Sequence, residues 1–279
     1  MRKEINIRSL GAFAAHLRSE EREESTIDAY LRNIGTFADW LGDRAVAKET
    51  VMAWKDALAE RYAPATVNVK LAAVNAFFKF CGWYDCCVKA LRLQRRVFRD
   101  PGRELTKAEY QRLVEAARSR GRTRLALLME TVCGTGIRVS EVRYMTVEAA
   151  RNGRAEIALK GKVRTIMLPG KLCRKLLKYA KKQNIASGEI FLTRSGSSLS
   201  RRQIWAEMKS VCKAAGVEPS KVFPHNLRHL FATTFYRTCR DIVKLADVLG
   251  HSSINTTRVY LITTGAEHAR TLERLGLVS

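Results

Sequence analysis

Residues 224–235 read Pro-His-Asn-Leu-Arg-His-Leu-Phe-Ala-Thr-Thr-Phe, and this stretch is typical of a buried helix that carries reactive side chains. His225 and Arg228 are three positions apart, so a helix places both on one face. The apolar residues that follow are sufficient to bury the helix and hold the pair rigidly. Histidine exchanges a proton near neutral pH, and arginine binds phosphate through two parallel hydrogen bonds. The stretch therefore indicates a site that acts on phosphate.

Two other clusters carry related chemistry. Residues 134–141 read Gly-Thr-Gly-Ile-Arg-Val-Ser-Glu, in which Glu141 is one turn from Arg138 and suited to orient it through an ion pair. Residues 249–253 read Leu-Gly-His-Ser-Ser, and His251 precedes Tyr260 by nine positions. Gly250 is expected to end one helix, and Ser252 or Ser253 to cap the next. His251 would then lie at a helix junction, where it can hydrogen-bond a phosphate oxygen.

These residues together suit metal-free cleavage of a phosphodiester. Arg138 and Arg228 can clamp the non-bridging oxygens, whose negative charge grows in the transition state. Tyr260 is the candidate nucleophile, which cationic neighbours or a base must activate. The departing 5′ oxygen requires a general acid. Lys160 and Lys162 both qualify, and the register of the predicted hairpin favours Lys160.

Charge and composition narrow the class of partner. The chain of 279 residues has a net charge of +23 and a pI of about 10.1, which predicts a polyanionic partner such as nucleic acid. Residues 1–100 hold 17 basic and 13 acidic residues, whereas residues 101–279 hold 33 and 14. The C-terminal part should therefore supply most of the salt-sensitive affinity for phosphates.

The sequence also indicates where the protein works. No signal peptide or membrane-spanning stretch is expected, and we place the protein in the cytoplasm, associated with the nucleoid. The seven cysteines include no Cys-x-x-Cys spacing. We therefore expect reduced thiols and neither a metal nor a cofactor.

The pattern of apolar residues predicts two domains in a mainly α-helical fold with a small β-sheet. Residues 1–93 form a helical, DNA-binding domain. Its four helices cover residues 7–17, a segment capped by Ser25 or Thr26, residues 48–59, and a segment starting at Pro64. Residues 94–104, which contain Pro101-Gly102 and several arginines, form a basic linker.

Residues 105–279 are predicted to form a mixed α/β catalytic domain. Thr106 and Glu109 have the spacing of a capping box at the start of a helix. Residues 155–159 and 164–169 are expected to pair as a hairpin around a turn at 160–163. Residues 190–192 are expected to form a short strand, and the chain from Ser200 onward to be helical.

Candidate DNA contacts are polar and basic residues spread over both domains. They are expected on the second and fourth helices, in the linker, on the hairpin and near Ser200. The residues are Thr26, Tyr30, Asn33, Asn68, Lys70, Arg95, Arg96, Lys162, Arg164, Arg201 and Arg202.

The three clusters, in this order, resemble the tyrosine recombinase, or phage integrase, family over nearly the whole chain, and most closely its short, Xer-like integrases. The runs that match are Thr-Gly-Ile-Arg-Val-Ser-Glu, His-Asn-Leu-Arg-His-Leu-Phe-Ala-Thr and Leu-Gly-His-Ser-Ser-Ile-Asn-Thr-Thr-Arg-Val-Tyr. By this resemblance the active site consists of Arg138, Lys160, His225, Arg228, His251 and Tyr260. One departure is the hairpin, which reads Lys-Gly-Lys-Val-Arg at 160–164, one residue shorter than the usual Lys-Gly-x-Lys-x-Arg.

The resemblance implies a core-binding domain and a catalytic domain that clamp DNA at specific inverted-repeat sites. Members of the family form a 3′-phosphotyrosyl bond, and the freed 5′-hydroxyl attacks the partner strand. Because the covalent intermediate conserves the bond energy, no ATP and no metal are required. Four protomers act pairwise through a Holliday junction. The helical pattern begins near residue 7, so no additional arm-binding domain is expected.

The C-terminal tail has an amphipathic pattern, which the family uses to dock on a neighbouring protomer. Its residues are Glu267, His268, Ala269, Leu272, Leu275 and Leu277. We expect docking in trans, whereas packing on its own domain is the alternative.

Other functions remain open at this point. A non-catalytic DNA-binding protein of the same fold would bind without forming an adduct. A topoisomerase or hairpin-forming resolvase would cleave without exchanging strands, and an RNA-binding protein is disfavoured because no aromatic RNA-reading motif is visible. Integration of a mobile element and resolution of chromosome dimers are both consistent with the sequence.

Overall fold

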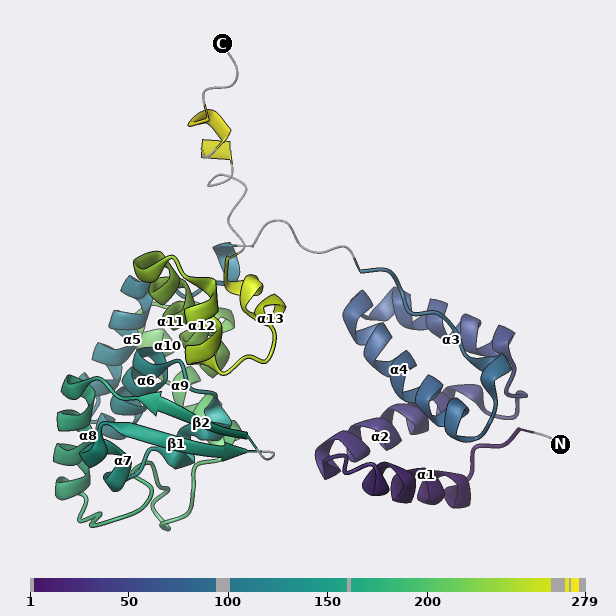
Figure 1. The fold of residues 1–279 in the computed structure, drawn as a ribbon, viewed down its shortest axis with the longest axis horizontal. Coiled ribbons are helices and arrows are strands. Elements are labelled where there is room, and N and C mark those ends of the chain that lie inside the picture. Colours follow the sequence, from purple (N-terminus) through teal and green to yellow (C-terminus); the bar gives the residue numbers. More distant parts are fainter. Residues whose placement is uncertain (1–2, 94–100, 160–161, 262–268, 271, 276–279) are drawn as a thin grey trace. The chain divides into compact units, whose positions relative to one another are not determined.

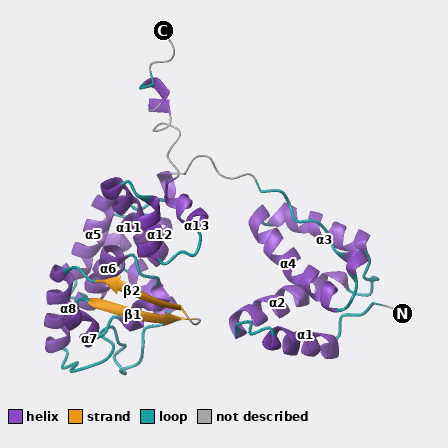
Figure 2. Cartoon of the chain, viewed as in Figure 1, coloured by secondary structure: helices purple, strands orange, loops and turns teal. Residues whose placement is uncertain are grey.

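The chain divides into two compact units, residues 1–95 and 96–279 (Figure 1). The computed structural model describes residues 3–93, 101–159, 162–261, 269–270 and 272–275. Each unit has a hydrophobic core of its own, so each is described by itself. The described residues are mainly α-helical and contain one two-stranded sheet, which confirms the predicted fold class (Figure 2).

The first unit is a small helical bundle. Its elements are α1 (Ile7–Ser19), α2 (Glu24–Leu41), α3 (Lys48–Arg61), α4 (Pro64–Phe80) and a 3₁₀ turn (Tyr84–Cys86). Aromatic rings fill its centre: Phe37 lies 4.9 Å from Trp54, and Phe13 meets Phe77 edge-on at 5.5 Å, measured between ring centroids. Such pairs add to the stabilisation from burial alone.

Two helix starts in this unit test the rules for helix ends. Pro64 is the first residue of α4, as predicted, because its missing N–H needs no partner there. The prediction that Ser25 or Thr26 caps α2 is wrong. The helix begins at Glu24, and the carbonyl of Glu23 accepts from the amides of Thr26 and Ile27. Both candidate residues therefore lie inside the first turn rather than before it.

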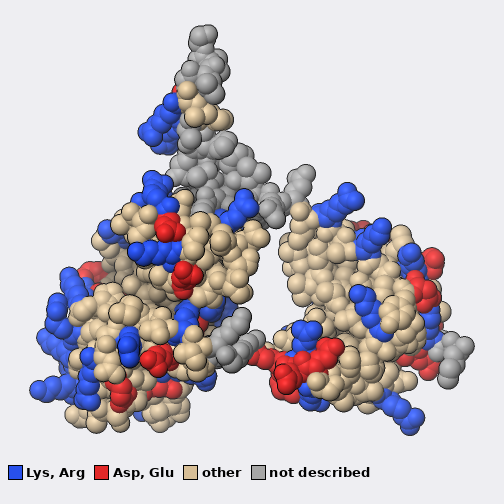
Figure 3. All heavy atoms as spheres, viewed as in Figure 1, with Lys and Arg blue, Asp and Glu red and all other residues tan. Residues whose placement is uncertain are grey.

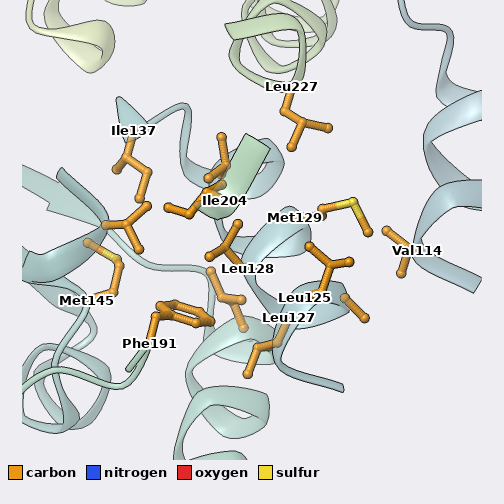
Figure 4. Close-up of a cluster of buried hydrophobic side chains, with 14 of the residues drawn as sticks. Val114, Leu125, Leu127, Leu128, Met129, Ile137, Met145, Phe191, Ile204 and Leu227 are labelled. Atoms are coloured by element: carbon orange, nitrogen blue, oxygen red, sulfur yellow. The ribbon is translucent and has the colours of Figure 1, made fainter. Parts of the chain in front are cut away.

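The second unit packs helices around a hairpin. Its elements are η2 (Pro101–Arg103), α5 (Lys107–Ser119), α6 (Thr123–Thr135), η3 (Val139–Tyr144), α7 (Val147–Asn152), β1 (Arg154–Leu159), β2 (Lys162–Met167), α8 (Gly170–Lys182), α9 (Arg201–Lys209), α10 (Cys212–Ala215), η4 (Pro219–Lys221), α11 (Pro224–Cys239), α12 (Ile242–Leu249), α13 (Ile254–Arg258) and η5 (Val259–Leu261). The buried helix α6 runs through the core and contacts residues from many of these elements (Figure 4). The capping box of Thr106 and Glu109 starts α5, as predicted.

The β-structure differs from the sequence-based expectation in two places. Strands β1 and β2 pair up to Leu159↔Lys162, so β2 begins at Lys162, two residues earlier than predicted. The short strand expected at 190–192 is absent from the described strands. Only the isolated bridges Thr146↔Glu189 and Leu192↔Ser198 occur there. Ile190 and Phe191 are almost completely buried, so their apolar character reflects core packing.

Helices α11, α12 and α13 carry the C-terminal motifs. Gly250 ends α12 in the left-handed conformation, and the hydroxyl of Ser253 accepts from the backbone amide of Asn255 at the start of α13. Tyr260 follows in η5 and packs with Leu245 and Leu249 of α12 in a small buried cluster. The nucleophile proposed from the sequence is thus held by apolar packing.

No helix in the described part of the chain is long and apolar enough to cross a membrane. The described residues also contain no group of three or more His, Cys, Asp or Glu side chains arranged to hold a metal ion.

Candidate active site

Segments from four parts of the second unit meet around one cavity of about 870 Å³. They are the start of η3, the first turns of α9 and α11, and the chain from His251 to Tyr260. The lining residues are Ile137, Arg138, Val139, Ser140, Arg201, Arg202, Trp205, Phe223, Pro224, His225, Arg228, His251, Thr256 and Tyr260. The structure therefore brings together five of the six residues predicted to be catalytic. The sixth, Lys160, lies outside the described residues.

Glu141 is the buried centre of an ion-pair network. Its side chain is only 2% exposed, and its two oxygens accept from Nη1 of Arg138 at 2.9 Å and from Nη2 of Arg164 at 2.8 Å. It also accepts from the backbone amide of Arg138 at 2.7 Å. Because three hydrogen bonds fix the carboxylate, Glu141 can hold Arg138 with its guanidinium at the cavity.

Arg164 has a different place from the one predicted. We expected it to contact DNA, but its side chain is 15% exposed and turns inward from β2. It donates to Glu141 and to the carbonyl of Leu249, so it joins the hairpin to the end of α12. Its stem also lies where a side chain on Gly250 would point. Arg164 is thus a positioning residue inside the site, which the sequence alone did not indicate.

The backbone turn at Gly136 makes room for α11. Gly136 has φ +67°, which favours glycine, and a Cβ added there would collide with the ring of Phe231. The turn brings the carbonyl of Gly136 to Arg228, which donates to it from Nη1. Gly136 therefore allows the close packing of α6 against α11, whereas a Cβ added at Gly134 would meet nothing within 4 Å.

Arg228 is buried, with 3% of its surface exposed. Its Nη2 donates to the carbonyl of Leu249 at 2.8 Å and to Nε2 of His251 at 2.9 Å. Burial, followed by the nearby charge of Arg138, lowers its pKa, while the hydroxyl of Tyr260 opposes the shift. An arginine nevertheless stays charged, so Arg228 presents a fixed cation to the cavity.

The hydrogen-bond partners of His251 indicate which of its two ring nitrogens carries the proton. Because guanidinium groups only donate, Nε2 of His251 must accept from Arg228, and Nδ1 carries the hydrogen that points to Oγ1 of Thr257 at 2.9 Å. Burial, then Arg228 and Arg138, lower the pKa of His251 to about 4. His251 is therefore neutral at physiological pH, and Thr257 is a supporting residue that the sequence analysis missed.

Three histidines surround the ring of Tyr260. The ring centroids of His225, His251 and His229 lie 6.4, 6.0 and 5.2 Å from that of Tyr260. Burial, then the charges of Arg228 and Arg201, lower the pKa of His225, which favours its neutral, proton-accepting form. His229 was not predicted, although its position four residues after His225 places it on the same face of α11. It also lies 3.8 Å from the carboxylate of Glu104.

Charge is unbalanced within the site. Three guanidinium groups, those of Arg138, Arg164 and Arg228, lie near a single carboxylate, that of Glu141. The excess positive charge faces a cavity that also includes Arg201 and Arg202 at the start of α9, both of which are exposed. A doubly esterified phosphate carries one negative charge and two free oxygens, which suits this arrangement.

The candidate DNA contacts in the first unit lie on α2 and α4. Tyr30 stacks on Phe13, and Nζ of Lys70 lies 3.5 Å from Oδ1 of Asn33. The side chain of Asn68 is bonded in both directions to the backbone of Leu91, at 2.9 and 2.7 Å. Asn68 thus anchors the chain after α4.

Of the other predicted DNA contacts, the structure describes Thr26 and Lys162 but not Arg95 and Arg96. Thr26 is half-buried on the first turn of α2, and Lys162 is the first residue of β2. Arg95 and Arg96 fall outside the described residues.

A helical fold with a hairpin, two arginines, two histidines and a buried tyrosine around one cavity defines a DNA strand transferase of the tyrosine type. The model of the phage integrase family matches residues 103–266, and that of the phage integrase N-terminal SAM-like domain matches residues 10–83. Since the first match alone covers more than half of the chain, the protein belongs to the phage integrase family. This confirms the resemblance seen in the sequence.

Two relatives and one solved structure show the extent of the similarity. The tyrosine recombinase XerA of Pyrococcus furiosus is 29% identical over 287 residues, which cover 99% of this chain and 97% of the relative. XerA of Thermococcus kodakarensis is 30% identical over 267 residues, covering 92% and 91%. A lambda integrase tetramer bound to a Holliday junction has a TM-score of 0.73 at 18% identity, over 91% of this chain and 76% of that one.

Proposed function

We propose that this protein is a site-specific DNA recombinase that cuts and rejoins strands through a covalent bond between Tyr260 and a 3′ phosphate. The observation that carries the proposal is the meeting of Arg138, Arg228, His225 and His251 with Tyr260 at one cavity. Arg138 precedes the other four residues by 87 to 122 positions, so closeness along the chain does not explain the arrangement. The relatives named as tyrosine recombinases support the same activity.

The geometry suggests a role for each side chain. Arg138 and Arg228 bind the two non-bridging oxygens and stabilise the charge that develops on them. His225, neutral and close to Tyr260, takes the phenol proton as the oxygen attacks phosphorus. Nε2 of His251 accepts a hydrogen bond from Arg228 in this state, so the contribution of His251 is to fix Arg228. Glu141 orients Arg138.

The general acid is assigned to the hairpin. Strand β2 begins at Lys162, and Arg164 ties this strand to Glu141 and the end of α12. Because the strand that follows Lys160 is attached to the site, we propose that Lys160 protonates the departing 5′ oxygen. A substrate with sulfur in place of that oxygen needs no acid. We expect it to restore cleavage by Lys160→Ala, whereas Lys162→Ala should cleave the ordinary substrate nearly normally.

The assembly is proposed from the family. Lambda integrase has been solved as a tetramer on a Holliday junction, and we propose that four copies of this chain act in the same way on inverted-repeat sites in nucleoid DNA. We further propose that the C-terminal tail docks in trans. Most of the tail lies outside the described residues. Deletion of residues 266–279 should abolish synapsis, and intact strand exchange by the deletion variant would refute docking in trans.

The central test is covalent capture. Nicked duplexes taken from the DNA that flanks the gene are incubated with the protein in EDTA, and adducts are resolved on denaturing gels. Wild type should form an adduct, and Tyr260→Phe should bind equally and form none. Tyr236→Phe on α11 is the matched control and should behave as wild type.

Three outcomes of this test separate the alternatives. Binding to a fragment that contains the site, without an adduct, would replace the proposal by a non-catalytic DNA-binding protein. An adduct whose resolution never joins two duplexes would indicate a topoisomerase or resolvase. An adduct followed by exchange between duplexes is the expected result, and the fragments recovered would also tell integration from dimer resolution.

A further inference from the structure

Helix α8 carries a cationic face that the active site does not use. It holds six basic residues and no acidic residue: Lys171, Arg174, Lys175, Lys178, Lys181 and Lys182. At 100° per residue these six fall within an arc of about 120°. The opposite side is apolar and buried through Leu172, Cys173, Leu176 and Ala180. The cations therefore form one continuous stripe, and Figure 3 shows blue side chains along the edge of the second unit where α8 lies in Figure 1.

Most of these cations have no acidic partner. Lys175 is bonded to Glu130 at 2.7 Å, but among the described residues no ion pair involves the other five, all of which are exposed. Helix stability does not account for them either. Lys181 and Lys182 favour the helix dipole at the C-terminal end, but Lys171 in the first turn opposes it.

The stripe continues into a second cavity at the C-terminal end of α8. This cavity of about 510 Å³ is lined by the cations Arg122, Arg124, Lys182 and Arg194. Glu207 is the one carboxylate among its described lining residues, and it is neutralised by Arg124 at 2.6 Å. The stripe and the cavity together thus present a strong excess of positive charge; we call them the α8 surface.

The α8 surface is separate from the catalytic cavity. The two cavities share no lining residue. Helix α6 reaches the second cavity with its first residues, Thr123 to Leu125, and leads to the active site at its other end, where Gly136 follows. At 1.5 Å per residue the two ends of this helix are about 18 Å apart. The catalytic cavity and the second cavity are therefore reached from opposite ends of α6.

The spacing of the stripe fits a nucleic-acid backbone. From Lys171 to Lys182 the helix rises about 16 Å, which corresponds to about five base-pair steps of duplex DNA. Exposed lysines and arginines in a row contact phosphates without reading bases, and each neutralised phosphate releases counterions. We propose that the α8 surface is a second, sequence-independent binding site for duplex DNA, which holds DNA other than the segment being cleaved.

Local protection of lysines tests where the DNA binds. The Tyr260→Phe protein is acetylated with a lysine-specific reagent, with and without excess of a short random-sequence duplex, and modification is read by mass spectrometry. Lys171, Lys178, Lys181 and Lys182 should be protected by the duplex, whereas the exposed residues Lys107, Lys213 and Lys244, which line neither cavity, should not. Equal reactivity of the two groups would overturn the proposal. Protection by polyglutamate but not by the duplex would overturn the choice of DNA as the partner.

A charge variant provides an independent measurement. In the first variant, Arg174, Lys178 and Lys181 are all changed to Gln. The slope of log Kobs against log salt concentration for binding of the random duplex should then decrease in magnitude by about 3. The matched triple change is Lys107→Gln, Lys213→Gln and Lys244→Gln, which should leave the slope unchanged. An equal decrease in both variants would refute a localised site. Both should form the Tyr260 adduct on a nicked site at the wild-type rate, so the test remains distinct from that of catalysis.

Discussion

The arginines of the active site and the cations of α8 belong to the same unit but are held in opposite ways. Arg228 is 3% exposed and donates to two backbone carbonyls and a histidine, while Arg164 is bonded to Glu141 and to Leu249. Arg174 and Lys178 on α8 are exposed, and no ion pair of theirs occurs among the described residues.

The difference separates two uses of positive charge. Burying a charge is costly, so it persists only where hydrogen bonds compensate, and the result is a group fixed before the substrate arrives. An exposed cation costs little and contributes attraction that salt screens. Substitutions of the buried active-site arginines should therefore change the rate of cleavage and the stability. Substitutions of the exposed cations on α8 should change only salt-dependent binding.

The largest effect is expected at Arg228. Arg228→Lys keeps the charge but loses the planar fork that reaches Gly136, Leu249 and His251. The rate of adduct formation on a nicked site should fall about 10²- to 10³-fold, with binding largely retained. Arg174→Lys on α8 is the control and should leave the rate unchanged. A near-normal rate for Arg228→Lys would remove the distinction between fixed and exposed cations.

Glu141→Gln should cost the most stability. The change leaves Arg138 and Arg164 without a counter-charge in a site where Glu141 is 2% exposed, and we expect a loss of about 3 kcal/mol in the free energy of unfolding. Glu207→Gln breaks the ion pair with Arg124. The side chains of Arg124 and Glu207 are 26% and 29% exposed, so this change should cost at most about 1 kcal/mol. Urea unfolding of both variants measures the difference, and equal losses would contradict it.

Gly136→Ala separates backbone strain from packing at the site. Gly136 and Gly153 have nearly the same φ, +67° and +68°, but only at Gly136 would a Cβ meet Phe231. Alanine at Gly153 should cost about 1 kcal/mol from strain, and at Gly136 about 1–3 kcal/mol more from overpacking. Thermal unfolding compares the two variants. Equal shifts in Tm would show that Phe231 moves aside freely.

The last prediction concerns the dependence of stability on pH. The pKa of His251 is lowered to about 4 by burial and by Arg228, and that of His225 is lowered as well. The unfolded chain takes up these protons near pH 6.5, while the folded chain does not, so stability should be full above pH 6.5 and fall as the pH decreases towards 4. His251→Gln should flatten this decline, and Tyr236→Phe on α11, which leaves every histidine in place, should not. Unchanged curves for both would indicate that His251 is protonated freely.

Much of the fold could be predicted because its signals are local. Pro64, the Thr106–Glu109 capping box and Gly250 each mark a helix end through their own backbone chemistry, and each lies where expected. The short strand expected near Phe191 was wrong because an apolar run reports burial and not the conformation of the buried segment. The cap expected at Ser25 failed because residue type alone does not fix the first turn.

The sequence by itself determined the family, the fold class and the set of residues proposed for catalysis, since these follow from motifs whose order and spacing are visible along the chain. The roles of those residues remain predictions. Only the tertiary structure decided that Arg164 turns inward, that Glu141 holds two arginines and that the proton of His251 lies on Nδ1. Arg138 and Gly250 are 112 residues apart, and Arg164 and Leu249 are 85. Such contacts depend on how separate helices pack, which no local pattern specifies.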